Sequence, residues 1–166
     1  MRETRINHDA HGLTFCVVAA RFNQALVEAM VTAALETLAS RGASDADIEL
    51  RWVPGAFELP LAARWAAQSN RFGAVLAFGV VIRGETEHYR LIVESTAHAF
   101  QRVALESGVP VLDGVLAVLN AEQAEARAGG THGNRGADVA LAAIAMANLK
   151  RECARDAASP PAGVSR

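Results

Sequence analysis

One segment near the middle of the chain carries residue types that could hold an anion and move a proton. The apolar run Ala74–Ile82 is followed directly by Arg83–His88, which reads RGETEH. A glycine lets backbone N–H groups approach a ligand closely, and the first N–H groups of a following helix are free to bind an anion. A histidine at the same place can exchange protons near neutral pH. Because a solvated loop could have the same residues, the interpretation depends on what lies beside the segment.

The elements around this segment alternate between strand and helix patterns. Continuous apolar runs predict buried strands at Leu13–Ala20, Ile48–Val53, Ala74–Ile82 and Val111–Leu119. Periodic apolar positions and capping residues predict helices over 24–41, 59–69, 87–107, 122–128 and 138–153, with Asn23 as the N-cap of the first and a glycine-rich link at 129–136. Four strand–helix units predict right-handed crossovers and a parallel sheet. We therefore expect an α/β fold: a flavodoxin-like three-layer α/β/α sandwich with a four-stranded parallel sheet.

The length of 166 residues fits a single domain. We expect an N-terminal arm at 1–12, one α/β domain at 13–154 and a disordered tail at 155–166, which contains Ser159-Pro160-Pro161. The extended arm, Arg2 to His11, is a candidate strand for the free sheet edge of a neighbouring subunit.

Composition narrows the class of protein. The net charge is −2 and Lys150 is the only lysine, so a nucleic-acid groove is not expected. The polar N-terminus has no apolar core of a signal peptide, and no apolar run is long enough to cross a bilayer, which predicts a cytoplasmic protein without a membrane partner. Cys16 and Cys153 form no metal or disulfide pattern, and both are expected to be small core residues.

Aromatic and polar residues also follow the first and second predicted strands. Arg21–Asn23 follow the first, and Pro54–Glu58 (PGAFE) follow the second. The carboxyl ends of parallel strands meet at one edge of a sheet, where α/β proteins bind ligands. Phe22 and Phe57 would suit a flat heteroaromatic ligand, because phenylalanines in surface loops are seldom needed for the core.

Several nucleotide and metal motifs are absent from the sequence. It contains no G-x-x-x-x-G-K-[ST], G-x-G-x-x-G, H-E-x-x-H or G-x-S-x-G, and its five histidines do not cluster. The residues alone therefore predict a cofactor-independent enzyme, or a binding protein, for a flat polar ligand that carries an anionic group. No metal is expected.

Five segments, in their order and spacing, resemble the 6,7-dimethyl-8-ribityllumazine synthase family. They are Arg21–Asn23, Val53–Pro60, Val81–Tyr89, Glu122–Ala124 with Arg127–Gly129, and Gly133–Gly136. The resemblance covers about residues 13–151. It implies a transferase of riboflavin biosynthesis that condenses 5-amino-6-(D-ribitylamino)uracil with 3,4-dihydroxy-2-butanone 4-phosphate, releasing phosphate and water. This is the penultimate step of the pathway and needs no cofactor.

The resemblance also implies a role for each matched residue. His88 would be the catalytic proton carrier, and Phe22 would stack on the pyrimidine. The residues that would contact the ribitylaminouracil are Phe22, Asn23, Ala56, Phe57, Glu58, Val80, Val81, Ile82 and Asp113. The phosphate would be held by Gly84, Glu85, Thr86 and Arg127, and Arg135 and Asp138 would support the site from behind.

The sequence departs from the pattern of the family at Asp113, at Glu94-Ser95 and at Ala117-Val118-Leu119. Asp113 stands where members usually present an aromatic or aliphatic side chain to the bound ring. Two alternatives follow: a non-catalytic shell protein that binds flavin or lumazine, and a riboflavin synthase of similar fold. The intact phosphate residues, Gly84–Thr86 and Arg127, argue against the second.

The resemblance further implies a homo-oligomer. Family members form pentamers whose active sites lie between adjacent subunits, and the link at 129–136 has no insertion relative to members that form an icosahedral 60-mer. We therefore expect a pentamer-based shell, with the small-molecule substrates and riboflavin synthase as partners.

Overall fold

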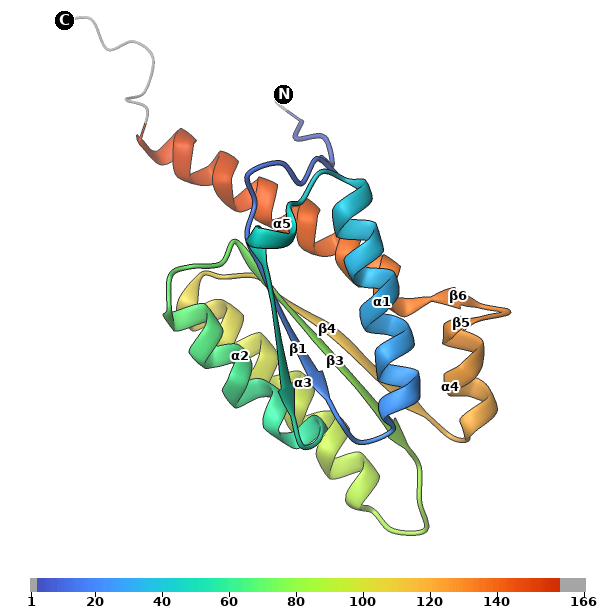
Figure 1. Cartoon of the computed structure of the whole chain (residues 1–166). Coiled ribbons are helices and arrows are strands. Elements are labelled where there is room, and N and C mark those ends of the chain that lie inside the picture. Colours follow the sequence, from blue (N-terminus) through green and yellow to red (C-terminus); the bar gives the residue numbers. More distant parts are fainter. Residues whose placement is uncertain (1–2, 159–166) are drawn as a thin grey trace, which may run out of the picture.

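A four-stranded parallel sheet forms the centre of the protein (Figure 1). The computed structural model describes residues 3–158. The strands are β1 (Phe15–Ala20), β2 (Ile48–Val53), β3 (Ala74–Ile82) and β4 (Val111–Val118), and they lie in the order β2-β1-β3-β4. Every neighbouring pair is parallel. The predicted four-stranded parallel sheet is therefore confirmed, and its strand order reverses between β1 and β3, where α/β proteins bind ligands.

Helices cover both faces of the sheet and complete three layers (Figure 1). Helices α1 (Gln24–Ser40) and α5 (Arg135–Ala158) pack together on one face. On the other face lie α2 (Leu59–Gln68) and α3 (His88–Ser107). Helix α4 (Ala121–Arg127) follows the end of β4, and the short 3₁₀ helices η1 (Asp45–Asp47) and η2 (Ala56–Glu58) flank β2. The flavodoxin-like α/β/α arrangement is as predicted.

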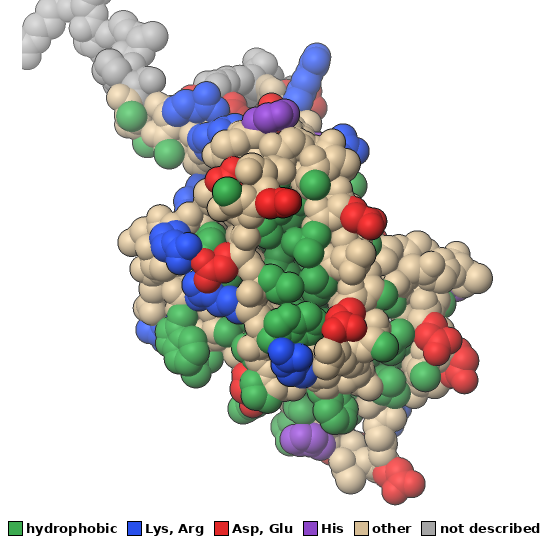
Figure 2. Space-filling view, in the orientation of Figure 1, with side chains coloured by type: hydrophobic (Ala, Val, Ile, Leu, Met, Phe, Trp, Pro, Cys, Tyr) green, Lys and Arg blue, Asp and Glu red, His purple; other side chains and the backbone are tan. Residues whose placement is uncertain are grey.

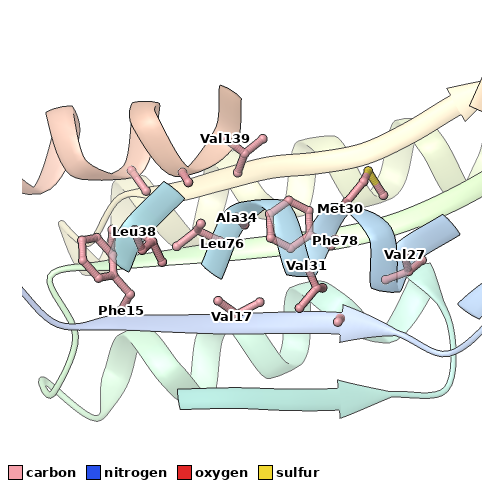
Figure 3. Packing of buried hydrophobic residues seen from close by; sticks show 14 of the residues in the cluster. Phe15, Val17, Val27, Met30, Val31, Ala34, Leu38, Leu76, Phe78 and Val139 are labelled. Atoms are coloured by element: carbon pink, nitrogen blue, oxygen red, sulfur yellow. The ribbon is translucent and has the colours of Figure 1, made fainter. Parts of the chain in front are cut away.

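Two apolar clusters, one on each side of the sheet, hold the layers together. Figure 3 shows the larger, in which Leu38, Met30 and Val31 of α1 pack on Phe15, Leu76 and Phe78 of β1 and β3. Four alanines of α2 are buried in the other cluster, which lets this helix lie close to the strands. All six residues of β1 are buried because helices cover both of its faces.

The C-terminal third differs in detail from the prediction. The expected link contains a small antiparallel hairpin, β5 (Ala128–Gly130) and β6 (Gly133–Asn134). Helix α5 begins at Arg135 instead of Asp138, because the Asn134 side chain caps it, and it continues through Ala158. Residues 155–158, expected in a disordered tail, are therefore helical; the remainder of the predicted tail, 159–166, lies outside the described residues.

The two cysteines differ in burial. Cys16 lies in the core, and burial raises the pKa of its thiol to about 11, so it is not a nucleophile at neutral pH. Cys153 is exposed on α5, so its predicted burial was wrong. It lies beyond the part of α5 that packs on the sheet.

The N-terminal arm forms no strand between residues 3 and 10. The buried Asn148 of α5 donates hydrogen bonds to the carbonyl oxygens of Asn7 and Asp9, at 3.2 and 2.8 Å. The Ala10 N–H donates to the Arg41 carbonyl at 2.8 Å. The second half of the arm is thus fixed on its own chain, and pairing of Arg2–His11 with a neighbour stays a prediction, in which Arg2 lies outside the described residues.

Candidate active site

A pocket of about 500 Å³ opens at the carboxyl edge of the sheet, beside β1, β2 and β3. Residues from the ends of all three strands line it. Among the predicted site residues, the pocket contains Phe22, Ala56, Phe57, Glu58, Val80, Val81, Ile82, Gly84, Thr86 and His88. Three segments that are far apart in the sequence thus meet where the parallel topology predicted.

Hydrogen bonds fix the turn after β1 to the end of β2 and to the end of β3. The N–H groups of Arg21 and Phe22 donate to the carbonyl oxygens of Val53 and Pro54, at 2.8 and 3.2 Å. Asn23 lies in the left-handed region with φ of 57°, and its side chain does not cap α1 as predicted. Instead its Nδ2 donates to the Val80 carbonyl oxygen at 2.9 Å. The turn therefore bridges the ends of β2 and β3 and places Phe22 over the pocket.

Two phenylalanines present their rings to the pocket. Phe22 and Phe57 are 71% and 63% exposed, so the described residues leave most of the apolar surface of each ring unburied. Ala56, in the same 3₁₀ helix as Phe57, is buried and anchors η2 on the sheet. Glu58 ends η2 with its carboxylate facing the pocket. The wall thus combines aromatic faces with an acceptor for hydroxyl groups.

The loop after β3 leads into the first turn of α3. The Arg83 N–H donates to the Val118 carbonyl oxygen at 2.9 Å, which ties the start of the loop to β4. Gly84, Glu85 and Thr86 are exposed, and α3 begins at His88. Gly84, Thr86 and His88 line the pocket, whereas Glu85 does not. Unpaired backbone N–H groups of a helix start, a hydroxyl and an imidazole therefore meet at one end of the pocket.

Asn23 and Glu85 do not line this pocket, and four further predicted site residues lie away from it, on the side of the sheet formed by the edge strand β4. Asp113, Arg135 and Asp138 line a separate cavity of about 380 Å³ between α3, β4 and α5. A guanidinium N–H of Arg135 donates to the Asp113 carbonyl oxygen at 2.9 Å, and the Asp113 carboxylate accepts from the Val115 N–H at 2.9 Å. Arg127 ends α4 and has no hydrogen-bond or ion-pair partner within residues 3–158. The chain thus separates its predicted site into two groups.

Four residues that line the pocket were not among the predicted site residues: Pro54 and Gly55, which directly precede Ala56, and two residues of α3. Tyr89 and Ile92 of α3 line the pocket together with His88. Ile92 lies four residues after His88 and so on the same face of the helix, a spacing that could have identified it. These side chains make the wall beneath the histidine more apolar.

The described residues contain no candidate metal-binding cluster. No three His, Cys, Asp or Glu side chains between residues 3 and 158 come close enough together to bind one. In the same part of the chain, no helix is long and apolar enough to span a membrane. What the pocket offers is aromatic stacking, hydroxyl and anion binding, and one imidazole for proton transfer.

Fold and pocket define a class: an α/β protein with a pocket at the reversal point of a parallel sheet, whose lining suits a flat, hydroxylated, anionic ligand. Comparison with known proteins specifies it further. Residues 12–151 match the family model described as 6,7-dimethyl-8-ribityllumazine synthase. The chain is 49% identical to the 6,7-dimethyl-8-ribityllumazine synthase of Stenotrophomonas maltophilia (strain R551-3), over 81% of this chain and 87% of that protein. It is 47% identical to the protein of the same name from Xanthomonas euvesicatoria pv. vesicatoria (strain 85-10), over 81% and 88%.

The chain therefore belongs to the 6,7-dimethyl-8-ribityllumazine synthase family, as the resemblance of its motifs indicated. It is an enzyme of riboflavin biosynthesis and a transferase.

Proposed function

We propose that the pocket condenses 5-amino-6-(D-ribitylamino)uracil with 3,4-dihydroxy-2-butanone 4-phosphate to 6,7-dimethyl-8-ribityllumazine, with release of phosphate and water. One observation carries this assignment: two exposed phenylalanines, a carboxylate, an anion-binding helix start and a histidine line one pocket. These groups match the aromatic ring, the ribityl chain, the phosphate and the proton transfers of the reaction.

The pyrimidine and the ribityl chain would occupy the part of the pocket nearest β1 and β2. The ring of Phe22 is available to stack on the pyrimidine, because it is largely exposed and its turn is held by hydrogen bonds. Glu58 would accept hydrogen bonds from ribityl hydroxyl groups, beside the backbone of Ala56 and Phe57. The Asn23 Oδ1 would be free to do the same, since its Nδ2 is engaged by Val80.

The phosphate of the second substrate would lie at the start of α3. Backbone N–H groups of Gly84–Thr86 and the Thr86 hydroxyl provide donors there. An arginine would supply the countercharge, because its planar guanidinium binds two phosphate oxygens at once. Arg127 suits this role, since no other described residue engages it.

Catalysis would combine positioning with proton transfer. The 5-amino group of the pyrimidine is itself a nucleophile, so holding both substrates in register supplies part of the acceleration. His88 borders the same end of the pocket as Gly84 and Thr86. It would move the protons that imine formation, phosphate elimination and ring closure require.

We further propose that adjacent subunits share each site. Phe22, Phe57, Glu58 and His88 line the pocket of one chain, whereas Asp113, Arg127 and Arg135 lie at the other edge of its sheet. A cyclic oligomer would bring the second group of one subunit against the pocket of the next.

Strand β2 gives independent support for assembly. It pairs only with β1 among the described strands, and Figure 2 shows hydrophobic side chains in a strip along β2 and the adjoining face of α1. Leu50 of β2 is a large apolar residue that is 39% exposed. An unpaired, apolar edge is suited to a strand from a neighbour, for which the arm at 1–12 is the candidate.

We propose pentamers that close into an icosahedral 60-mer in the cytoplasm. In this proposal the domain at 13–154 forms the shell, and riboflavin synthase is the partner that uses the product. Light scattering at neutral pH tests the assembly, and the mass of a pentamer or decamer would refute the shell.

An absorbance assay tests the reaction. The purified protein is mixed with both substrates, and lumazine formation is compared with the spontaneous reaction. Formation above that background supports the proposal, whereas tight riboflavin binding without product would identify a non-catalytic binding protein.

A further inference from the structure

The Asn134 side chain makes three hydrogen bonds, although it does not line the candidate pocket. Its Nδ2 donates to the carbonyl oxygens of Ala29 and Ala128, at 3.2 and 3.1 Å. Its Oδ1 accepts from the Gly136 N–H at 2.8 Å. One half-buried amide therefore joins α1, the hairpin β5–β6 and the start of α5.

The hydrogen bond from Asn134 to the Ala128 carbonyl oxygen fixes the backbone of the residue that follows Arg127. Ala128 is buried, directly follows α4 and begins β5, so its carbonyl marks the point where the helix passes into the hairpin. Asn134 links this carbonyl to Ala29 of α1, which directly precedes the buried Met30. The backbone that follows Arg127 is thereby tied to α1.

The hydrogen bond from the Gly136 N–H to Asn134 fixes the backbone of the residue that follows Arg135. It caps the first turn of α5, in which Arg135 is the first residue. Arg135 in turn donates to the Asp113 carbonyl oxygen at the edge of the sheet. A single side chain thus fixes the backbone directly after each of the two arginines of the predicted site.

The backbone around Asn134 is closely packed, which leaves the side-chain amide of this residue little room to move. A Cβ on Gly136 would collide with the carbonyl group of Met30, and one on Gly130 would lie 2.8 Å from the Glu125 carbonyl oxygen. The His132 N–H also donates to the Ala126 carbonyl oxygen at 2.8 Å. Hairpin, α4 and α1 therefore form one rigid unit, in which Asn134 is the central polar contact.

We infer that Asn134 is a positioning residue, which holds Arg127 and Arg135 in the geometry that binds the phosphate of the butanone substrate. The inference rests on the proposed function, because it takes Arg127 as the phosphate ligand. A carboxamide suits the position because it offers two N–H donors for carbonyl oxygens and one acceptor for an N–H.

Substitution by serine separates positioning from helix capping. Asn134→Ser keeps a good cap for α5 but is too short to reach Ala29 and Ala128. The assembled enzyme is assayed with each substrate varied and with inorganic phosphate, a product, as inhibitor. We expect the KM for butanone phosphate and the inhibition constant of phosphate to rise roughly 10- to 100-fold, because small displacements of a binding group have large effects. The KM for ribitylaminouracil should stay within about twofold.

Asn148→Ala is a matched control. Asn148 is a buried asparagine of α5 that also makes three hydrogen bonds, to Asn7, Asp9 and Arg151, and it lies several turns along the helix from Arg135. Its loss should lower the melting temperature without a selective change in either KM. Asn134→Ser with wild-type phosphate inhibition, or with equal changes for both substrates, would overturn the inference.

Arg127→Ala, measured in parallel, distinguishes failure of the inference from failure of the proposed function. If Arg127→Ala weakens phosphate inhibition and Asn134→Ser does not, only the role of Asn134 is refuted. If Asn134→Ser weakens it and Arg127→Ala does not, Asn134 acts through Arg135 and the assignment of Arg127 fails. If neither variant changes phosphate inhibition, both proposals are wrong.

Discussion

The two halves of the predicted site are built in different ways. The pocket half consists of short segments that directly follow β1, β2 and β3, so the parallel topology alone brings Phe22, Glu58 and His88 together. The arginine half is spread over an edge strand, the end of α4 and the start of α5. Nothing in the sheet topology places Arg127, and an asparagine and two closely packed glycines fix it instead. The pocket thus follows from the fold, whereas the position of the proposed countercharge, Arg127, depends on local contacts.

The largest effect is expected in the pocket half, where loss of His88 should lower the turnover number. His88→Ala removes the only imidazole that lines the pocket within residues 3–158. We expect kcat to fall roughly 10- to 1,000-fold, with the lower values possible because the reaction also proceeds without enzyme. Steady-state kinetics at saturating concentrations of both substrates measure it. An unchanged kcat would remove His88 from the mechanism.

Substitution in the arginine half should change affinity for one substrate. Arg127→Ala should weaken binding of butanone phosphate by about 2–4 kcal/mol, because a charge-assisted bidentate contact is lost. Binding of ribitylaminouracil should change far less. The KM values of the two substrates, measured separately, check this. Equal losses would indicate that Arg127 supports the structure and does not bind phosphate.

Asn23 connects the pocket half to the sheet and should have a smaller effect. Asn23→Ala loses the bond to Val80 and places alanine in the left-handed region, whereas Asn23→Gly loses only the bond. We expect the alanine variant to lose about 1–2 kcal/mol of unfolding free energy and the glycine variant about 1 kcal/mol or less. Urea denaturation measures both. Both variants should raise the KM for ribitylaminouracil, since Phe22 becomes less well held, and an unchanged KM would contradict that role.

The smallest effect is expected at Asp113. Its carboxylate is engaged by the Val115 N–H and is exposed at the edge of β4. Asp113→Phe should tighten riboflavin or lumazine binding by roughly 3- to 10-fold, because an aromatic ring is a better contact for the bound ring than a carboxylate. Quenching of flavin fluorescence measures the affinity. Weaker or unchanged binding would show that Asp113 does not face the ligand.

Sequence patterns predicted the strands of the central sheet better than the segments around Arg127 and Arg135, for physical reasons. Continuous apolar runs identified all four strands, and Ala74–Ile82 matched β3 residue for residue, because a strand buried on both faces carries a strong signal. The hairpin β5–β6 was not predicted, since its glycine-rich segment has no alternation of apolar and polar residues. The start of α5 was placed too late, although Asn134 is a good N-cap residue and could have marked it.

The same contrast holds for the site. The positions of Phe22, Phe57 and His88 followed from the ends of parallel strands. The conformation of Asn23 did not, because its choice between capping α1 and bonding Val80 is made by tertiary contacts. The assignment of Arg127 came from resemblance to the family and stays a prediction, since no pattern within one chain links it to the pocket.

Complementation between subunits tests the central claim, that each site takes one half from each of two neighbours. Chains carrying His88→Ala and chains carrying Arg127→Ala are co-expressed with different tags, and oligomers containing both are isolated. If neighbours share the site, one quarter of the sites in a random mixture combine an intact His88 with an intact Arg127. We therefore predict recovery of about a quarter of the wild-type activity. Mixed oligomers no more active than the two parent variants would show that each chain builds its own site, and would contradict the account.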